Sequence, residues 1–511
     1  MNRRGASGPL IHIERHGPGG LQEQICEGIR RAIVDGVMRP GMRLPSSRAL
    51  AEDLSVSRTT TLLAFDQLHA EGYLSSRHGS GTYVAEELPD DGPSATPFRL
   101  PASGGRPPMS RRGAALAEAL PITRRLPGPA RAFRIGVPAL DAFPVRLWSR
   151  LASRRTTSVT SVQLDYGPPA GLVALREAIA DHVQKSRGAR CHAEQVYVVG
   201  GAQRGLDFIC RLLLDPGTRA GMEEPGYPGA WTALTGAGAS IVPLDVDAEG
   251  LRVARDITPP AGVRLAYVTP SHQFPLGVPM SLSRRRALLE WARAARAWVV
   301  EDDYDSEFLY GTAPVPCLQG LDPDGRVIYV GTFSKSVFPA LRLGFVIAPP
   351  DLHARMLAAR RSAADSQPPF LDQAVMADFM SGGHYARHLR RMRSVYRERL
   401  EALVAAAARF CAGALTVRPA RTGLHAVADL RGVDAAAVFE EAMARGVEVM
   451  PLSAYFHGRS RGGHALVLGF GAVGPEAVRE GMRTLAAAIE AARRRPAGVH
   501  ASAAARDRRL G

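Results

Sequence analysis

One lysine has the chemistry to form a covalent bond with an aldehyde. The chain carries 64 basic lysine and arginine side chains, yet only Lys185 and Lys335 are lysines. A lysine amine can lose its proton and attack an aldehyde, whereas a guanidinium stays protonated and is not nucleophilic. Lys335, in the segment Gly331–Ser336, is therefore predicted to form a Schiff base with pyridoxal phosphate, unless it is an ordinary solvated loop lysine.

An acidic segment supplies a second part of such a site. A predicted strand at 297–300 leads into Glu-Asp-Asp-Tyr-Asp at 301–305. A carboxylate at Asp302 can keep the pyridine nitrogen of the cofactor protonated, and Tyr304 can donate to its phenolic oxygen. Alternate residues of an extended chain point to the same side, so both side chains are expected to face one ligand. A metal site is the alternative, but this segment lacks nearby histidine ligands, so no metal is predicted.

Two further segments offer donors to a phosphate. A predicted strand at 196–199 feeds the small residues at 200–205, where backbone N–H groups can approach an anion at the start of a helix. Around the lysine, Thr332, Ser334 and Arg342 add two hydroxyls and a guanidinium. The strand ends of a parallel sheet meet at one edge, so these segments are expected to surround one ligand.

Composition is that of a globular protein with several domains. The 511 residues are 46% hydrophobic and 22% charged, without an apolar run long enough for a signal or membrane segment. The five cysteines are scattered and form no C-x-x-C pair, which favours a reducing cytoplasm over a disulfide framework. We expect a DNA-binding domain at 9–85, a flexible linker at 86–130, a cofactor domain at 131–493 and a disordered basic tail at 494–511.

Net charge alone does not establish a nucleic-acid partner. The formal charge is +15, but residues 1–85 hold ten arginines against eight acidic residues. The local pattern is more informative. Apolar residues every four positions from Leu21 to Ile33 predict a first helix, Ser46 or Ser47 can cap a second, and Ser57 can cap a third. Two short predicted strands around Gly79 and Gly81 then form a wing, which completes a winged helix-turn-helix.

Residues 39–84 resemble the GntR-type winged-helix regulators. They contain Pro-Gly-x-x-Leu-Pro-Ser-Ser-Arg, Val-Ser-Arg-Thr-Thr, Glu-Gly-Tyr and Gly-x-Gly-Thr-x-Val in that order. The resemblance implies binding to double-stranded DNA, with a small helical bundle carrying incidental arginines as the alternative. It implies that Arg48 contacts the DNA backbone, that the recognition helix uses Ser57, Arg58 and Thr60, and that the wing uses His78 and Gly79.

Most of residues 131–490 resembles the fold-type I aminotransferases. The segments 166–172 and 224–228 carry this likeness together with those around Asp302 and Lys335. The resemblance implies an α/β fold with a mostly parallel sheet, a smaller C-terminal α+β subdomain and a homodimer. It also implies that Tyr227 lies against the cofactor ring and Gln273 near the phenolic oxygen. Around the phosphate it places Gly201, Ala202, Gln203, Thr332, Ser334 and Arg342, with Tyr166 supplied by a second subunit.

The fusion of these two domains is the layout of the MocR subgroup of GntR regulators, from which the chain also departs. Aminotransferases usually hold the substrate carboxylate with an arginine at a position that is Val467 here. Arg459 and Arg461 lie just upstream, in a segment typical of an exposed loop. An arginine that follows the Tyr227 position in a subgroup member responsive to γ-aminobutyrate is replaced by Gly229.

These patterns favour a cytoplasmic transcriptional regulator that binds pyridoxal phosphate and DNA and senses the cofactor, or an amine or amino-acid effector. A working aminotransferase that carries a winged helix is the main alternative. The lysine and the Asp302 carboxylate fit both hypotheses, whereas the missing arginine favours regulation without sustained turnover. A third possibility is a binding module that has lost its cofactor.

Overall fold

The computed structural model describes residues 11, 13–14, 20–77, 81–88, 109–118, 125–253, 259–310, 315–362, 368–457 and 462–494. The chain divides into two units, Met1–Pro107 and Pro108–Gly511. Each unit has its own buried apolar cluster, so each is described separately.

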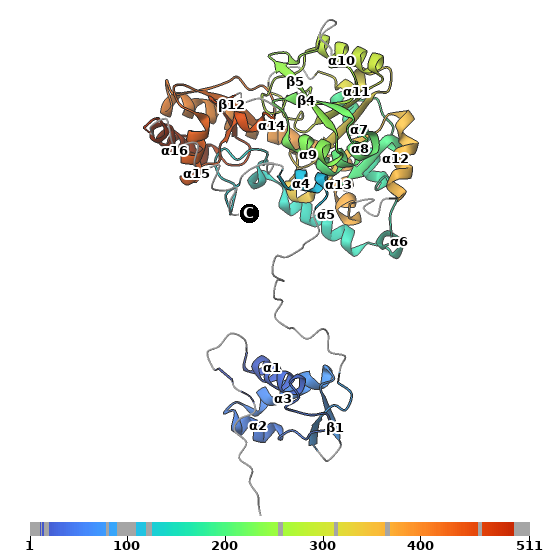
Figure 1. The fold of residues 1–511 in the computed structure, drawn as a ribbon, viewed down its shortest axis with the longest axis vertical. Coiled ribbons are helices and arrows are strands. Elements are labelled where there is room, and N and C mark those ends of the chain that lie inside the picture. Colours follow the sequence, from blue (N-terminus) through green and yellow to red (C-terminus); the bar gives the residue numbers. More distant parts are fainter. Residues whose placement is uncertain are drawn as a thin grey trace, which may run out of the picture. The chain divides into compact units, whose positions relative to one another are not determined.

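The first unit is a winged helix-turn-helix. Its helices and strands are α1 (Leu21–Val34), α2 (Ser47–Asp53), α3 (Arg58–Ala70), β1 (Leu74–Arg77) and β2 (Gly81–Val84). The two strands form an antiparallel hairpin in which Leu74 pairs with Val84. Figure 1 shows α1, α2 and α3 against one another, with β1 beside them. The predicted order of three helices followed by a wing is confirmed.

Buried side chains fix the three helices against one another. Ile25 and Ile29 of α1 and Leu68 of α3 are fully buried. Ser46, and not Ser47, caps α2 by accepting from Ala49 N at 3.1 Å. Ser57 caps α3 in the same way, and each cap satisfies one backbone donor that the helix start would otherwise leave unpaired.

The second unit is built on an eight-stranded sheet with the order β3-β10-β9-β8-β7-β4-β5-β6. The strands β9, β8, β7, β4 and β5 run parallel, whereas β10 and β6 are antiparallel to their neighbours. The bounds are β3 (Val196–Val199), β4 (Arg219–Glu224), β5 (Ser240–Asp247), β6 (Gly250–Leu251), β7 (Val263–Val268), β8 (Trp298–Asp303), β9 (Val327–Thr332) and β10 (Gly344–Ile347).

Helices cover both faces of this sheet, as a parallel sheet requires. Alternate residues of β9 show the division, because Ile328 and Val330 pack with α8, α9 and α12 while Val327 packs with α10 and α11. Helices α7, α13 and α14 bury further strand residues. The bounds are α5 (Val145–Thr157), α6 (Ser161–Leu164), α7 (Val173–Arg187), α8 (Ala202–Leu213), α9 (Pro228–Gly236), α10 (Leu282–Ala295), α11 (Leu318–Leu321), α12 (Pro350–Ser362), α13 (Phe370–Ser381) and α14 (His384–Phe410).

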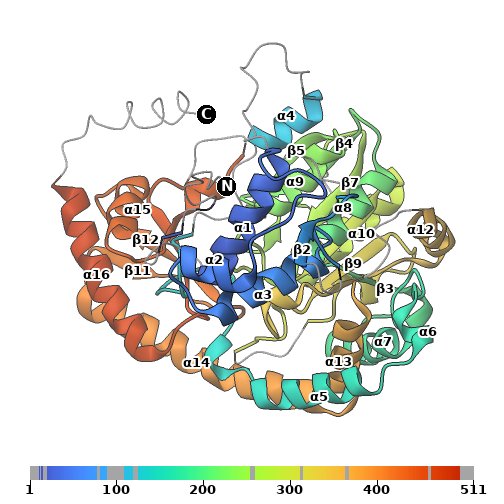
Figure 2. The same cartoon turned by 90° about the horizontal axis from the view of Figure 1, so that it is seen from below.

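A smaller α+β subdomain follows, drawn in orange to red in Figure 1. Its four antiparallel strands have the order β11-β12-β14-β13. In Figure 2, α16 and α14 lie side by side along its edge, and the two helices are in contact. The bounds are β11 (Leu415–Val417), β12 (His425–Leu430), α15 (Ala435–Ala444), β13 (Met450–Pro451), β14 (Ala465–Gly469) and α16 (Pro475–Arg493).

The predicted linker, 86–130, is partly built into the second unit. Helix α4 (Arg111–Glu118) contacts α9, and the side chain of Leu116 lies 3.6 Å from where a Cβ of Gly236 would stand. Residues 125–130 also belong to this unit. The boundary between the two units lies at Pro107, inside the predicted linker. It lies there because Leu116, in the Arg/Gly-rich stretch, packs on α9.

The cysteines and the character of the helices bear on the cellular environment that the sequence predicts. All five cysteines are buried and unpaired, and burial raises the thiol pKa of Cys210 to about 12. Within the ranges that the structure describes, no helix combines the length and apolar character needed to cross a membrane.

Candidate cofactor site

A cavity of about 480 Å³ opens at the carboxyl ends of β8 and β9. Ligand sites of open α/β sheets lie at this edge, because the strand ends and following loops converge there. Ten of the predicted cofactor residues line the cavity, namely Gly201, Ala202, Gln203, Tyr227, Asp302, Tyr304, Thr332, Ser334, Lys335 and Arg342. The three predicted segments therefore line one cavity.

Asp302 presents one carboxylate oxygen that no described residue satisfies. Its Oδ2 accepts from the Tyr267 hydroxyl at 2.7 Å, whereas its buried Oδ1 has no hydrogen-bond partner among the described residues. Burial raises the pKa of Asp302 to about 7, although the hydrogen bond from Tyr267 opposes this shift. An unsatisfied buried oxygen is costly, so this geometry suits a ligand that donates a charged N–H.

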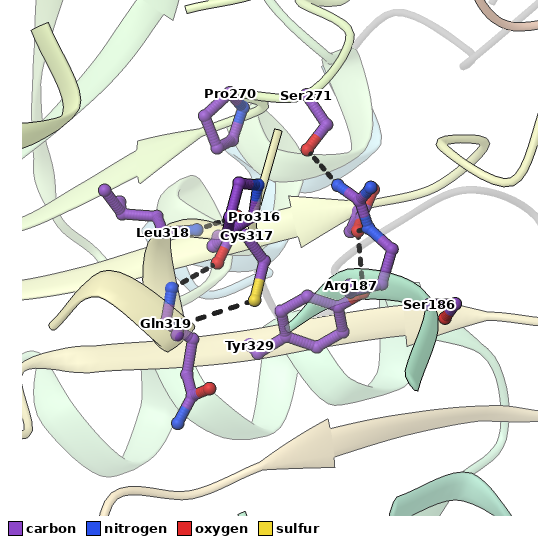
Figure 3. A network of polar contacts seen from close by, with 12 residues as sticks. Ser186, Arg187, Pro270, Ser271, Pro316, Cys317, Leu318, Gln319 and Tyr329 are labelled. Carbon is purple, nitrogen blue, oxygen red and sulfur yellow. Dashed lines mark hydrogen bonds and ion pairs between the residues drawn. The ribbon is translucent and has the colours of Figure 1, made fainter. Parts of the chain in front are cut away.

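The neighbouring acids of β8 point to the other face of the sheet and hold the scaffold. Figure 3 shows this face, where Arg187 bonds Ser271 Oγ at 2.6 Å. Arg187 also pairs with Asp303 at 2.8 Å, and Tyr329 donates to the same carboxylate. Burial alone would raise the pKa of Asp303, but Arg187 lowers it. Glu301 accepts from the backbone N–H groups that start α11. The acidic segment is thus divided between two faces of the sheet.

Lys335 lies at the centre of the cavity lining. Its Nζ donates to the carbonyl oxygen of Gly136 at 2.8 Å. A Cβ at Gly136, where φ is +75°, would approach that nitrogen to 2.8 Å, so glycine leaves the amine room. Burial lowers the pKa of Lys335 to about 8, while Asp305 and Asp302 oppose the shift. A primary amine with such a pKa is partly uncharged near neutrality and suited to attack a carbonyl carbon.

The other end of the cavity offers an anion cradle. Helix α8 starts directly after Gly201, whose φ of +90° lets the backbone turn into the helix. A Cβ at Gly201 would lie 3.7 Å from the guanidinium carbon of Arg342. Arg342 itself has φ of +51°, a conformation that costs energy for a residue with a side chain. A dianionic phosphate suits this end of the cavity, because it can accept from the start of α8, from the Arg342 guanidinium and from the hydroxyls of Thr332 and Ser334.

A histidine and an aspartate hold Tyr304. His272 Nδ1 lies 2.8 Å from Asp305 Oδ1 and 3.0 Å from the Tyr304 hydroxyl. A carboxylate can only accept, so it fixes the proton on Nδ1 and leaves the tyrosine oxygen as a second acceptor. The Tyr304 proton is then available to the cavity. His272, Asp305 and His425 form a buried group whose potential metal-ligand atoms lie within 4.8 Å of one another, so histidines do lie beside the acidic segment. The hydrogen bond to Asp305 already uses His272 Nδ1.

Two predicted cofactor residues do not line the cavity. Gln273 is buried behind it, where its amide nitrogen donates to the carbonyl oxygens of Pro225 and Phe274 at 2.8 and 2.7 Å. Phe274 lines the cavity in its place and packs edge-to-face on Tyr227. Tyr166 is 98% exposed on this protomer, so its assignment to a partner's site stays a prediction. Arg459 and Arg461 lie outside the described residues.

Several residues that line the cavity were not predicted from the sequence. They include a basic residue, a glycine, two aromatic residues and a histidine, namely Arg125, Gly136, Phe274, Tyr267 and His425. Burial lowers the pKa of His425 to about 3, so it is neutral, and its Nε2 donates to Pro275 O. Tyr267 lies in a short run of residues typical of a strand, so its position in a strand could be predicted from the sequence. No local pattern marks Arg125 or Gly136.

The predicted DNA contacts lie at the start of α2 and α3. Arg48, Ser57 and Arg58 are exposed, and Thr60 is partly exposed. Ser57 Oγ accepts from Thr60 N at 3.1 Å and lies 2.7 Å from Thr60 Oγ1, so these hydroxyls also shape the helix start. His78 and Gly79 lie outside the described residues. The exposed helix start is where such domains contact DNA.

Comparisons with known proteins agree with both units. Residues 149–462 match aminotransferase class I and II, and residues 21–84 match the bacterial regulatory proteins of the gntR family. The chain is 40% identical over 482 residues to the probable rhizopine catabolism regulatory protein MocR of Rhizobium meliloti, covering 94% of this chain and 96% of that protein. It is 34% identical to the HTH-type pyridoxine biosynthesis transcriptional regulator PdxR of Corynebacterium glutamicum, covering 92% and 96%.

Solved structures resemble the second unit. A kynurenine aminotransferase from Pyrococcus horikoshii superposes with a TM-score of 0.64 at 27% identity, covering 71% of this chain and 92% of that chain. A winged helix-turn-helix fused to an aminotransferase-like domain defines a class of bacterial transcriptional regulator. This chain belongs to that class, as a member of the MocR subgroup of GntR-family regulators. Its aminotransferase class I and II domain implies dependence on pyridoxal phosphate.

Proposed function

We propose that this regulator holds pyridoxal phosphate as a Schiff base to Lys335 and changes its action on DNA when the cofactor, or an amine that reaches it, occupies the cavity. The unpartnered Oδ1 of Asp302, in the same cavity as Lys335, carries the proposal. A pyridinium N–H would satisfy that oxygen and bring a positive charge to a buried carboxylate. The bound cofactor supplies an electrophilic carbon and an electron-accepting ring.

The remaining residues have separate tasks in this proposal. The phosphate would lie at the start of α8, within reach of Arg342 and the hydroxyls of Thr332 and Ser334. Tyr227 would cover the ring, supported by its contact with Phe274. Tyr304 would donate to the phenolic oxygen, because His272 leaves its proton unused.

The DNA partner would bind the first unit through residues 39–84. Arg58 at the start of α3 is proposed to contact the major groove and Arg48 the backbone, with His78 and Gly79 at the minor groove. Control of binding by the cavity requires two states of the molecule with different affinities for DNA. A homodimer, in which Tyr166 reaches the partner's cavity, is part of the proposal.

Replacing Lys335 tests the cofactor assignment. Lys335→Ala is expected to abolish the visible absorbance band of the purified full-length protein, because no other amine lines the cavity among the described residues. The matched control is Lys185→Ala, since Lys185 is the other lysine and pairs on the surface with Asp181. A coloured Lys335→Ala protein, or a colourless wild type supplied with pyridoxal phosphate, would contradict the proposal.

A working aminotransferase is the second candidate, favoured by the solved structures that resemble this domain. Against sustained turnover stands Val467, which is fully buried in β14 where a carboxylate-binding arginine was expected. Purified protein supplied with an amino donor and a keto-acid acceptor is expected to show no more than a few turnovers. Continuous product formation at ordinary enzyme rates would establish the enzyme instead.

A further inference from the structure

Two positions that resemblance assigns to arginines in related proteins, Val467 and Gly229, offer no cation in this chain. Val467 is buried and packs with Ile135, behind the cavity wall. At Gly229, a Cβ would lie 2.2 Å from Gln203 Oε1 and 2.5 Å from the Tyr227 ring, so this position has no space for a side chain as the chain stands. A ligand with a carboxylate must therefore find its counter-charge elsewhere in the cavity.

The cavity lining contains two guanidinium groups with separate locations. Arg342 lies beside Gly201 at the phosphate end. Arg125 lines the same cavity, and its charge acts on Lys335. Burial is the main reason that the pKa of Lys335 falls to about 8, and the positive charge of Arg125 lowers it further. Arg125 thus stands within electrostatic reach of the amine.

The backbone next to Arg125 is held by a buried ion pair. Leu126 N donates to Glu448 Oε1 at 2.8 Å, and Leu126 O accepts from Arg134 Nη2 at 3.0 Å. Arg134 and Glu448 bond each other through two further contacts, and their side chains are only 10% and 4% exposed. Two backbone hydrogen bonds to a rigid pair keep this stretch of chain, and the arginine before it, at the cavity.

We propose that Arg125 binds the anionic group of an effector whose primary amine lies at Lys335. A guanidinium forms bidentate hydrogen bonds with a carboxylate or another planar anion. The fitting ligand class is a short amino acid with its amine and its acidic group at opposite ends. The cavity of about 480 Å³ lies within the usual range for small-molecule sites. This inference rests on the proposed function, because it needs the cofactor at Lys335.

The position of Arg125 connects the ligand to the segment that leads from the DNA-binding unit. Residues 125–130 follow α4, and α4 packs on α9. The first residue of α9, Pro228, lines the cavity next to Tyr227. An anion on Arg125 would therefore occupy a cavity that the end of the linker and the start of α9 both line. The free energy of ligand binding at Arg125 can then favour one arrangement of the linker over another.

The test compares charged and uncharged amines on the full-length protein loaded with pyridoxal phosphate. The absorbance of the bound cofactor is titrated with unbranched ω-amino carboxylates of increasing length, and with alkylamines of the same lengths. Wild type is expected to bind at least one amino carboxylate about tenfold or more tightly than its matched alkylamine. Arg125→Gln is expected to lose this preference, which is measured as the ratio of the two affinities within the same variant, because the charge of Arg125 also acts on Lys335.

The matched control is Arg131→Gln, since Arg131 is an exposed arginine near in sequence that does not line the cavity. It should keep the preference of the wild type, and Arg125→Lys should keep part of it. Equal preference in Arg125→Gln and wild type, or no preference in wild type, would overturn the inference while the protein remains coloured. A colourless wild type would instead reject the cofactor proposal, so the two failures are distinguishable.

Discussion

The environment of Lys335 sets the pH at which its amine becomes a nucleophile. Burial lowers its pKa to about 8, from the usual value of 10.5. The protonated form cannot attack an aldehyde, so the reactive fraction rises with pH until the amine is fully deprotonated. An exposed lysine would need a more alkaline solution to reach the same state.

Cofactor uptake by stripped protein should follow this titration. Below pH 8, the rate of colour development after addition of pyridoxal phosphate is expected to rise almost tenfold per pH unit. Above about pH 8 it should level off, because most of the Lys335 amine is already neutral. Stopped-flow absorbance between pH 6 and 10 measures this profile. A rate that continues to rise through pH 9.5 would show that burial does not depress the pKa.

Much of this site was predictable from residue types near strand ends. Asp302, Tyr304, Lys335 and Arg342 each belong to a recognisable local segment, and the parallel sheet brings the segments together. Gln273 shows the limit of such reasoning. The resemblance placed it near the phenolic oxygen, but the turn after β7 directs its amide to backbone carbonyls and presents Phe274 to the cavity.

At the scale of elements, one buried hydroxyl connects the two helices of the helix-turn-helix. Thr61 of α3 is fully buried, and its Oγ1 lies 2.8 Å from the carbonyl oxygen of Ser47, the first residue of α2. A second acceptor, the carbonyl oxygen of Arg58, lies at 2.9 Å. This contact fixes α2 against the start of α3, where the predicted DNA contacts lie.

Thr61→Val keeps the shape of the side chain and removes this hydrogen bond. We expect it to destabilise the first unit by about 1 to 2 kcal/mol, because Val cannot replace the lost donor. Faster amide hydrogen exchange in α2 and α3 of the full-length protein would measure the loss. The matched control is Thr59→Val, an exposed position in the same helix, which should change stability by less than about 0.5 kcal/mol. Equal exchange in both variants would contradict the assigned role of Thr61.

The types and order of the helices and strands could be predicted from hydrophobic periodicity and turn residues. The structure of the linker could not be predicted in this way. The stretch before Arg131 is rich in Pro, Gly and Arg, a composition typical of a flexible chain. Its helix α4 is ordered because Leu116 finds a surface on α9, a contact between segments more than a hundred residues apart. Arg125 was missed for the same reason, since its place at the cavity depends on the distant pair Arg134 and Glu448.

At the scale of the whole molecule, the predicted DNA contacts and the cofactor cavity lie in different units. The predicted DNA contacts belong to the unit Met1–Pro107, and the cavity belongs to the unit Pro108–Gly511. A change in one unit should therefore leave the chemistry of the other intact. Control of DNA binding by the cavity therefore requires a change that is passed from one unit to the other.

Arg58→Ala separates DNA binding from cofactor binding. We expect affinity for the operator to fall about tenfold and the visible absorbance to stay unchanged. If Arg58 contacts a phosphate, the dependence of log affinity on log salt should also become shallower by about one unit. Electrophoretic mobility shift or fluorescence anisotropy at several salt concentrations provides the measurement, with exposed Arg31→Ala of α1 as control. Parallel loss of colour and DNA binding would show that the units are not separable.

The central claim is that the amine of Lys335 carries the cofactor beside Asp302. Borohydride reduction of the coloured full-length protein, followed by proteolysis and mass spectrometry, locates the attached group directly. Because the chain has only two lysines, Lys185 serves as an internal control in the same sample. We expect a pyridoxyl adduct on the peptide that contains Lys335 and none on the peptide that contains Lys185. An adduct on Lys185 alone, or no adduct on protein that is loaded with the cofactor, would contradict it.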